Sequence, residues 1–258
     1  MAKIGIIGSG GREHALGWKF SQHGHFVYYF PGNGGTEMEF RGKNIKIDGT
    51  KEENFPIVYD FVEREKLDML VVGPEGPLVK KIIDYFNYWG YKRIVGPTGI
   101  AAELESDKFF SYDLMKELEI GQADSVKCYS LEEARKAINE RATDNGIVIK
   151  ARGLTGGKGV TVCNSKKQAL DIISEHIDKY GFHNLIAERL FGEEYSIFGI
   201  SDGSIVLPLE LSVQDFKRLQ EDDKGPNTGG MGSYCPTPFA SAQIIRDLTQ
   251  KVMNPRSC

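Results

Sequence analysis

One glycine-rich stretch has the residue types needed to hold a chain of phosphates. It contains four glycines and a lysine within seven residues: Gly153, Gly156, Gly157, Lys158 and Gly159. Glycine backbone N–H groups can approach phosphate oxygens closely, and lysine adds positive charge. The stretch is not a Walker A motif, because Arg152 stands at the first glycine position and strand-like residues follow it. A loop that folds over nucleotide phosphates is therefore favoured over an ordinary mobile hairpin.

Lys150 ends the apolar, strand-like run that precedes this loop. An inward-facing lysine is costly unless an anion compensates it, whereas a lysine that reaches solvent is not. Because the glycine-rich stretch follows so closely, we interpret Lys150 as an anion-binding group. Lys108 is a single lysine in a predicted helix and gives no comparable signal by itself.

A second unusual stretch, QDFKR followed by GPNTGGMG at 225–232, combines charged residues with proline and glycine. Pro226 fixes φ and the glycines permit positive φ, so a regular element is not expected there. Asp215 supplies an acid, and Lys217 and Arg218 supply two cations. This density of special residues favours a substrate-binding loop over a simple turn.

The N-terminal stretch KIGIIGSGGREHALGW begins like a dinucleotide-binding fingerprint. However, Glu13 stands where the third glycine belongs, and the second strand-like run leads into Pro31 and Gly32 instead of an acid for the ribose hydroxyls. NAD is therefore excluded. Arg12 and the start of the predicted helix suit a phosphate or another anion. We interpret His14 as structural.

The elements that position these residues follow from the hydrophobic pattern. The first hundred residues alternate strand-like and helix-like stretches, which predicts a parallel sheet covered on both faces. Ligands bind at the carboxyl ends of such strands. The loops after three of them are therefore expected to share one edge: 8–13, 32–35 and 73–77.

Near Glu105 the pattern changes to an α+β mixture. A helix is predicted over 107–119, and capping boxes that begin at Ser130 and Ser165 predict two more. Strands are expected on both sides of the glycine-rich stretch and within 184–211, whereas 214–236 reads as a loop.

Composition excludes several classes of protein. A formal charge of −4 argues against a general nucleic-acid binder. The four cysteines form no C-x-x-C pair, which argues against structural zinc and disulfides. There is no apolar run of about 18 residues and no signal peptide. We therefore expect a cytoplasmic globular chain with no membrane partner.

Together these motifs resemble the ATP-grasp ligases and, within them, the phosphoribosylamine–glycine ligases (glycinamide ribonucleotide synthetases) of purine biosynthesis. The motifs run in family order: GSGGREHAL at 8, PGNGGT at 31, VVGPEGPLV at 71, VGPT at 95, ESDKFF at 105, IVIKARGLTGGKGV at 147, GEEYS at 192, then QDFKR and GPNTGGMG. The resemblance implies an α/β fold with an N-terminal parallel-sheet, pre-ATP-grasp substrate-binding domain over 1–105. An ATP-grasp α+β domain follows over 106–258, with a lid subdomain at about 124–190. This domain is expected to be incomplete, because complete members continue through a strand with magnesium-binding Glu and Asn and then a further domain.

The resemblance also implies an activity. ATP would phosphorylate glycine to glycyl phosphate, and 5-phosphoribosylamine would displace phosphate to give glycinamide ribonucleotide and ADP. Magnesium, or manganese in its place, would accompany ATP, and no metal ligand is assigned within these residues. The partners would be small molecules, and the resemblance leaves the oligomeric state open. With the expected metal-binding strand absent, little ligase activity is expected of the chain alone.

Matched motifs assign three sets of residues. The implied catalytic residues are Lys150, Asp215, Lys217 and Arg218. The implied ATP-binding residues are Lys108, Lys150, Gly153, Gly156, Gly157, Lys158, Gly159, Glu188, Leu190, Glu193 and Glu194. The implied substrate-binding residues are Gly10, Gly11, Arg12, Glu75, Gly76, Asp215, Asn227, Thr228, Gly229 and Gly230.

Two positions depart from the family pattern. Arg152 replaces the usual acid and is expected to add positive charge beside the phosphates, and Phe216 stands where histidine or tyrosine is frequent. Two alternatives stay open: a nucleotide-binding but catalytically incompetent fragment, and an ATP-grasp carboxylate–amine ligase with other substrates.

Overall fold

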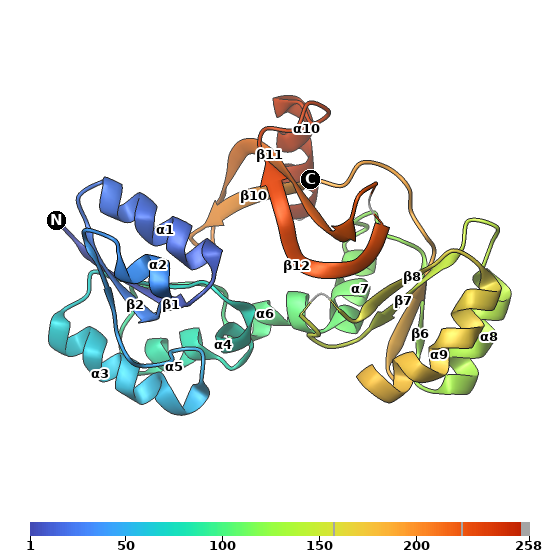
Figure 1. Cartoon of the computed structure of the whole chain (residues 1–258), viewed down its shortest axis with the longest axis horizontal. Helices are drawn as coiled ribbons and strands as arrows, with labels where there is room; N and C mark the ends of the chain where they lie inside the picture. Colours follow the sequence, from blue (N-terminus) through green and yellow to red (C-terminus); the bar gives the residue numbers. More distant parts are fainter. Residues whose placement is uncertain (157, 223, 254–258) are drawn as a thin grey trace. The chain divides into compact units, whose positions relative to one another are not determined.

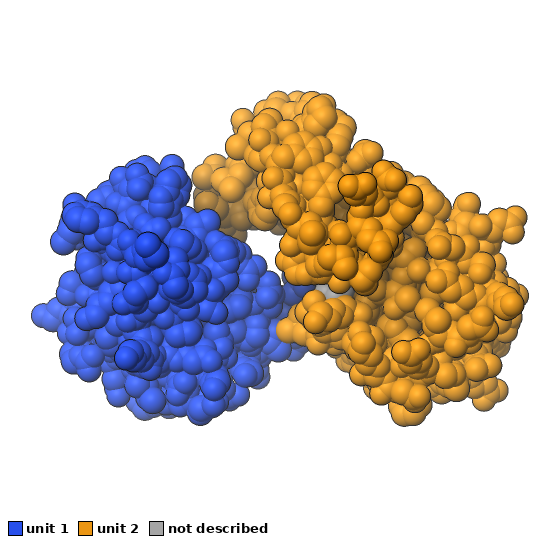
Figure 2. All heavy atoms as spheres, viewed as in Figure 1, with its two compact units in different colours: residues 1–106 blue, residues 107–258 orange. Residues whose placement is uncertain are grey.

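The N-terminal unit, Met1–Ser106, is built on a five-stranded parallel sheet with strand order β3-β2-β1-β4-β5 (Figure 1). A computed structural model describes residues 1–156, 158–222 and 224–253. It divides into this unit and a second one, Asp107–Cys258, which are coloured separately in Figure 2. The strands of the N-terminal unit are β1 (Lys3–Gly8), β2 (Phe26–Pro31), β3 (Gly42–Asn44), β4 (Met69–Val72) and β5 (Ile94–Val95).

Helices cover both faces of this sheet, which confirms the predicted parallel-sheet fold. Ile7 and Phe30 pack into one buried cluster, whereas Ile6 and Tyr29 pack into another, so successive strand residues serve opposite faces. The helical elements are α1 (Gly11–Gln22), α2 (Gly34–Glu37), η1 (Glu52–Asn54), α3 (Phe55–Glu65), α4 (Glu75–Val79), α5 (Ile82–Tyr88) and α6 (Gly99–Ser106). The stretch from Pro77 to Trp89 reads as one helix in sequence, but it is two, because Lys81 adopts a φ of +62°.

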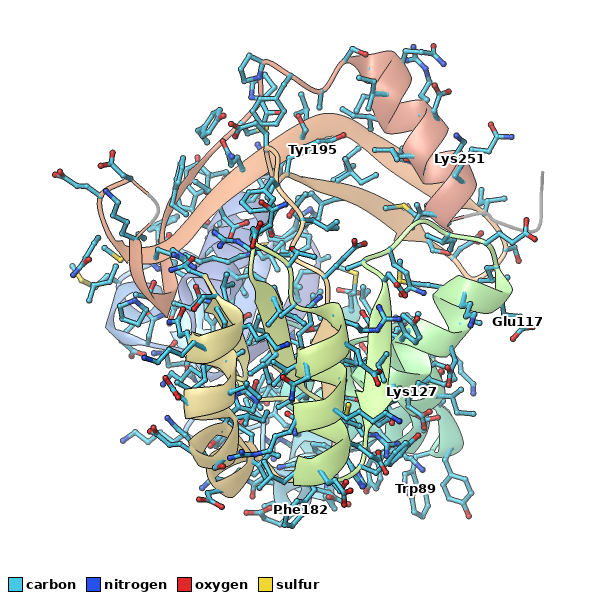
Figure 3. All side chains as sticks on the ribbon, turned by 90° about the vertical axis from the view of Figure 1, so that its right-hand side faces the viewer. Trp89, Glu117, Lys127, Phe182, Tyr195 and Lys251 are labelled. Carbon is cyan, nitrogen blue, oxygen red and sulfur yellow. The ribbon has the colours of Figure 1, made fainter. Side chains whose placement is uncertain are left out.

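The second unit begins with α7 (Lys108–Glu117) and a four-stranded antiparallel sheet of order β6-β9-β7-β8. Its strands are β6 (Ser125–Cys128), β7 (Ile147–Ala151), β8 (Val160–Cys163) and β9 (Asn184–Ala187). Two helices, α8 (Leu131–Arg141) and α9 (Lys166–Tyr180), lie side by side across one face of this sheet (Figure 3).

The predicted N-caps of α8 and α9 are confirmed. The Ser130 hydroxyl accepts the Glu133 N–H at 3.1 Å, and the Ser165 hydroxyl accepts the Gln168 N–H at 3.2 Å. The return bonds differ from an ideal capping box, because Glu133 and Gln168 accept the N–H of the residue before each cap. These caps fix where both helices begin.

A three-stranded antiparallel sheet completes the second unit: β10 (Ser196–Ser201), β11 (Val206–Gln220) and β12 (Lys224–Tyr234), followed by α10 (Ala242–Leu248) and η2 (Thr249–Met253). The sequence prediction of a loop over 214–236 is wrong, since β11 and β12 form a long hairpin there. Pro226 is compatible with a strand because β12 lies at the sheet edge. The pairing shifts register around Arg218, and Gly225, Gly230 and Gly232 have positive φ.

One face of the β10–β11 pair is apolar and exposed. Phe198 is paired with Leu209, and Ile200 with Leu207, so these four side chains share a face. They are 42% to 63% exposed. The opposite face is covered by α10 and η2, which pack against β10 and β11. Apolar patches of this kind favour association.

Replacing Leu207 and Leu209 together with lysine is therefore expected to lower binding of a hydrophobic dye and light scattering of the purified chain. The melting temperature is expected to change little, because neither side chain is in a buried core. Leu16→Lys, at a leucine of α1 that is 39% exposed, provides the matched control. Unchanged dye binding in the double variant, measured by fluorescence titration, would contradict the expectation.

No helix within the described ranges combines the length and apolarity needed to cross a membrane.

Candidate functional site

The glycine-rich stretch forms the turn of a hairpin between β7 and β8, as predicted. Lys150 is paired with Val160, and the Ala151 N–H donates to the Gly159 carbonyl at 2.8 Å. The turn holds four of the five predicted phosphate-binding residues: Gly153, Gly156, Lys158 and Gly159. The fifth, Gly157, lies outside the described residues.

Backbone is accessible in this loop. A Cβ added to Gly153 or Gly156 would meet no atom within 4 Å, so a ligand can approach both positions. Gly156 has a φ of +59°, a region that β-branched residues strongly disfavour. Lys158 is exposed, so its ammonium is also available to an anion.

Substituting Gly156 with valine is expected to weaken ATP binding about tenfold, equivalent to about 1.4 kcal/mol, because the loop must abandon its backbone conformation. Gly121→Val is the matched control, since Gly121 is exposed, has space for a Cβ and lies outside the loop. Calorimetric dissociation constants for ATP measure both variants. Equal constants for Gly156→Val and the parent would exclude a role for this backbone in binding.

Lys150 is a cation without a compensating anion. It lies at the end of β7 and is partly buried, and burial lowers its pKa. Among the described residues, nothing forms a hydrogen bond or ion pair with its ammonium group. A partly desolvated ammonium is costly in the unliganded protein and is well suited to bind an anion.

Arg152 does not carry free positive charge, contrary to the sequence expectation. Its Nε donates to both carboxylate oxygens of Asp107, at 2.9 and 3.0 Å, and Nη2 also contacts Asp107. Hydrogen bonds from Arg152 hold the pKa of Asp107 below its usual value. The charge of Arg152 is therefore neutralised within the protein.

Lys108 begins α7 and reaches the base of the glycine-rich loop. Its Nζ donates to the Gly153 carbonyl at 3.0 Å, and its backbone N–H donates to the Arg152 carbonyl at 3.0 Å. The structure thus brings Lys108 next to the loop that follows Lys150, although the sequence separates them by about forty residues.

The predicted adenosine-binding residues lie between β9 and β10. The Glu188 carboxylate accepts the Asp124 N–H at 2.8 Å, and Leu190 is 65% exposed. The Glu193 carboxylate accepts the Gln214 amide at 3.0 Å, and Glu194 pairs with Lys217 at 2.6 Å. This segment is therefore joined to β11, where the predicted catalytic residues lie.

The predicted catalytic residues other than Lys150, and the predicted substrate-binding residues of the second unit, lie on the two strands of the β11–β12 hairpin. Lys217 lies 3.9 Å from Asp215, and the Thr228 hydroxyl donates to the Lys217 carbonyl at 2.8 Å. Arg218 is paired with Asn227, and Gly229 and Gly230 follow in β12. Both motifs are thus adjacent, although the expected loop is a strand pair.

The N-terminal unit brings together the predicted residues at the carboxyl ends of β1 and β4. Gly10 and Gly11 lie at the N-terminus of α1, and Glu75 and Gly76 begin α4. Arg12 Nη1 donates to Glu75 at 3.1 Å. Burial opposes ionisation of Glu75, but a backbone N–H and Arg12 outweigh it and lower the pKa of Glu75. The half-exposed guanidinium of Arg12 and the N-terminus of α1 thus lie together in one corner of this unit, an arrangement whose charge suits an anion.

Glu13 is a site residue whose role sequence reasoning missed. It is 3% exposed, accepts the Gly10 N–H at 2.7 Å and accepts Arg12 Nε at 2.9 Å. A Cβ on Gly8 or Gly73 would collide with its side chain. Glu13 therefore joins the loops after β1 and β4, and the signal was the acid at the place of the third glycine.

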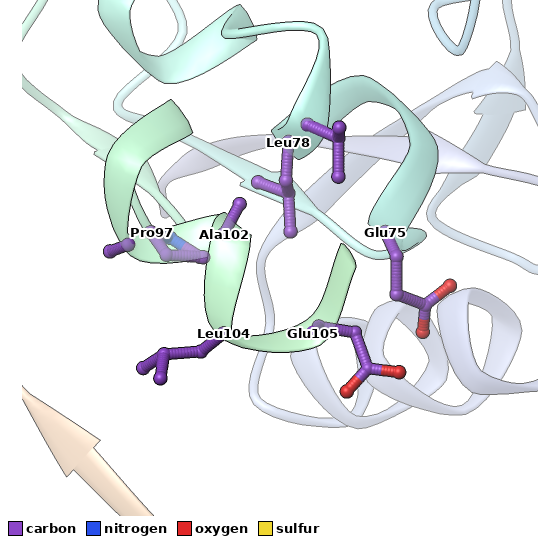
Figure 4. A pocket seen from close by; sticks show the side chains of 8 residues that line it. Glu75, Leu78, Pro97, Ala102, Leu104 and Glu105 are labelled. Carbon is purple, nitrogen blue, oxygen red and sulfur yellow. The ribbon is translucent and has the colours of Figure 1, made fainter. Parts of the chain in front are cut away.

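A pocket lies beside Glu75, between α4 and α6 (Figure 4). Its wall is mostly apolar, and two acids, Glu75 and Glu105, belong to its lining. The remaining lining residues are Leu78, Val79, Pro97, Ala101, Ala102 and Leu104.

No group of three or more His, Cys, Asp or Glu side chains within the described part of the chain is arranged to hold a metal ion.

Comparisons with known proteins find family models that together match nearly the whole chain. Residues 2–105 match the description "Phosphoribosylglycinamide synthetase, N domain", and residues 106–257 match "Phosphoribosylglycinamide synthetase, ATP-grasp (A) domain". The chain is 37% identical to a phosphoribosylamine–glycine ligase of Clostridium acetobutylicum, covering 98% of this chain and 60% of that protein. It is 39% identical to the Escherichia coli K12 enzyme of the same name, covering 98% of this chain and 59% of that protein. The chain thus spans about 60% of the length of these relatives.

The chain is also similar to solved structures. The crystal structure of phosphoribosylamine–glycine ligase from Thermotoga maritima superposes with a TM-score of 0.76 at 32% identity, covering 98% of this chain and 61% of that one. Carboxyaminoimidazole ribonucleotide synthase from Aspergillus clavatus, complexed with ATP, gives a TM-score of 0.70 at 14% identity. That match covers 99% of this chain and 63% of the other, and at this identity it shows the fold alone.

Proposed function

The chain belongs to the phosphoribosylglycinamide synthetase family, and we propose that it acts in the ATP-dependent ligation of glycine to 5-phosphoribosylamine. The products would be glycinamide ribonucleotide, ADP and phosphate. The observation that carries this proposal is Lys150, a partly buried ammonium at the base of a glycine-rich loop, for which the described residues offer no compensating anion. ATP would supply both the missing anion and the phosphoryl group that activates the glycine carboxylate.

The residues of the second unit fit the phosphates of ATP. Lys150 would bind one phosphate from β7, and the Gly153–Gly159 loop would cover the chain of phosphates with its backbone N–H groups. Lys108, held at the base of this loop by Gly153, would add a second cation. Closing the loop would exclude water from the activated carboxylate.

We assign the remaining motifs of the second unit to adenosine binding and to orientation of the substrates. Glu188 and Leu190 would contact adenine at the end of β9, and Glu193 or Glu194 would contact ribose. Because Glu194 pairs with Lys217, nucleotide contacts there would extend to the β11–β12 hairpin. Asp215, Arg218 and the 227–230 segment would orient glycine and the attacking amine.

The N-terminal unit would bind the phosphoribosyl substrate. Arg12 and the N-terminus of α1 at Gly11 would provide donors for a phosphate, and Gly10, whose N–H donates to Glu13, would let the phosphate approach closely. Glu75 fixes the guanidinium of Arg12, and Gly76 leaves the start of α4 open. The ranges 1–105 and 106–258 would thus divide binding of the phosphoribosyl group from binding of the nucleotide, with a lid at about 124–190.

Magnesium, or manganese, would neutralise charge between the phosphates during transfer. The acids of the described residues do not assemble a site for it, so no step is assigned to a metal ligand of this chain. We also propose a cytoplasmic location, supported by Cys128 and Cys163, which are buried as free thiols.

A coupled assay of ADP release tests the proposed reaction. With ATP and magnesium, turnover by this chain is expected to be slow, because its described acids assemble no magnesium site. The ADP that forms is expected to depend on glycine, and glycinamide ribonucleotide is expected to form only when phosphoribosylamine is added. ADP formed with other carboxylates but not with glycine would indicate a different ATP-grasp ligase. Tight ATP binding without ADP from any acid would indicate a nucleotide-binding protein that does not catalyse ligation.

A further inference from the structure

The Arg152–Asp107 ion pair joins two segments of the proposed ATP site. Arg152 directly follows β7, and Asp107 is the N-cap of α7, where its carboxylate accepts the Phe109 N–H at 2.9 Å. The guanidinium also lies over the Phe109 ring, 5.1 Å from its centroid. One acid therefore begins the helix and holds the arginine at the same time.

Backbone hydrogen bonds near the ion pair join the same segments of the chain. The Lys108 N–H donates to the Arg152 carbonyl, and the Arg152 N–H donates to the His183 carbonyl, each at 3.0 Å. Lys108 Nζ then reaches the next carbonyl, that of Gly153. The start of α7, the end of β7 and the base of the glycine-rich loop are thus tied at one point.

The ion pair and these hydrogen bonds determine where Lys108 lies relative to Lys150. Lys108 immediately follows Asp107, and Lys150 is two residues before Arg152 on the same extended segment. Lys150 is in β7, and Arg152 lies in the bend that directly follows this strand. A change in the pair would displace Lys108 relative to Lys150 and the loop.

We propose that Arg152 and Asp107 act as a positioning pair for the ATP phosphates: they hold Lys108, Lys150 and the glycine-rich loop in binding geometry without contacting ATP. This inference rests on the proposed function. Because Arg152 pairs with Asp107, it positions the phosphate-binding residues and does not itself bind the phosphates.

A purely structural role would predict a different result. The side chains of Arg152 and Asp107 are 42% and 24% exposed, and their bidentate contact can contribute to stability. A purely structural role therefore predicts a lower melting temperature with unchanged ATP affinity of the folded chain, whereas a positioning role predicts a loss of ATP affinity measured well below the melting temperature.

The test is a double-mutant cycle with Arg152→Ala, Asp107→Ser and the combined variant, using calorimetric ATP binding and thermal unfolding of the full chain. Serine at 107 keeps an N-cap while removing the charge. Each single variant is expected to weaken ATP binding about 5- to 20-fold, and the combined variant no more than either single, as for residues of one network. Arg246→Ala, which breaks the surface pair with Glu210, is the control and is expected to leave binding unchanged.

The direction in which Asp107→Ser changes ATP affinity distinguishes a positioning role of Arg152 from direct contact with ATP. If Arg152 contacted ATP directly, freeing it from Asp107 would strengthen binding, and this result would overturn the proposal. Arg152→Lys keeps the charge but not the two-pronged geometry, so it is expected to bind ATP as weakly as Arg152→Ala. Wild-type affinity in all variants would also overturn it, whereas a wild-type chain that binds no ATP would contradict the proposed function itself.

Discussion

Replacing Lys150 with methionine is expected to weaken ATP binding roughly 10- to 100-fold, the loss of one charge-assisted hydrogen bond of about 1.5–3 kcal/mol. Lys150 is partly buried and has no anionic neighbour among the described residues, so a phosphate would be its first partner. Methionine fills a similar volume without charge. The chain of phosphates would then lose a contact that water cannot replace in the partly buried site.

The same substitution is expected to leave the unliganded fold at least as stable. Burial lowers the pKa of Lys150 from 10.5, so the folded protein holds this proton less tightly than the unfolded chain does. The charged side chain therefore destabilises the fold at neutral pH, and this penalty disappears as the pH rises through the lowered pKa toward 10.5. Methionine removes the penalty, so its advantage in melting temperature is expected at neutral pH and should narrow at alkaline pH.

Calorimetric ATP titration and thermal unfolding at two pH values measure both effects. Lys136→Met, at an exposed lysine of α8, is the control and is expected to change neither quantity. Unchanged ATP affinity in Lys150→Met, together with a lower melting temperature, would show that Lys150 is a structural residue.

Arg12→Ala is expected to weaken binding of ribose 5-phosphate about 10- to 100-fold and to leave ATP affinity unchanged. The Arg12 guanidinium is 54% exposed and fixed by Glu13 and Glu75, so it is pre-oriented at the N-terminus of α1. Charge-assisted bonds from arginine to phosphate are strong, and their loss is not offset by the helix N-terminus alone.

Lys19→Ala, in the last turn of α1, removes an equal charge from the same helix and is the matched control. Parallel titrations with ribose 5-phosphate and with ATP report the two sites. Loss of ATP affinity alone in Arg12→Ala would show that the nucleotide and the phosphoribosyl ligand are assigned to the wrong units.

The parallel sheet was predictable because its strands are short apolar runs, such as the residues around Ile6 and Leu70, separated by amphipathic helices. Local sequence did not reveal the break at Lys81, since a single left-handed residue leaves the hydrophobic period intact. The β11–β12 hairpin was also missed. Its glycines and Pro226 oppose a strand locally, but an edge position, with interrupted register, accepts them.

Some features of the candidate site were also predictable from the sequence, whereas others were not. The hairpin after Lys150 and the corner at Arg12 follow from spacing and from parallel-sheet topology. The bonds among Arg152, Asp107 and Lys108 do not, because they join segments about forty residues apart whose contact depends on tertiary packing. Charge counting along the sequence therefore overstated the free positive charge near the loop.

We expect the two units to bind different ligands: ATP at the hairpin of the second unit and the phosphoribosyl group at the corner of the first. Hydrogen–deuterium exchange of the full chain tests this expectation directly, because it reports protection by segment. ATP with magnesium is expected to protect 147–163 and leave 8–22 and 73–79 unchanged, whereas ribose 5-phosphate is expected to do the reverse. Protection of the N-terminal segments by ATP, with none at 147–163, would contradict the account.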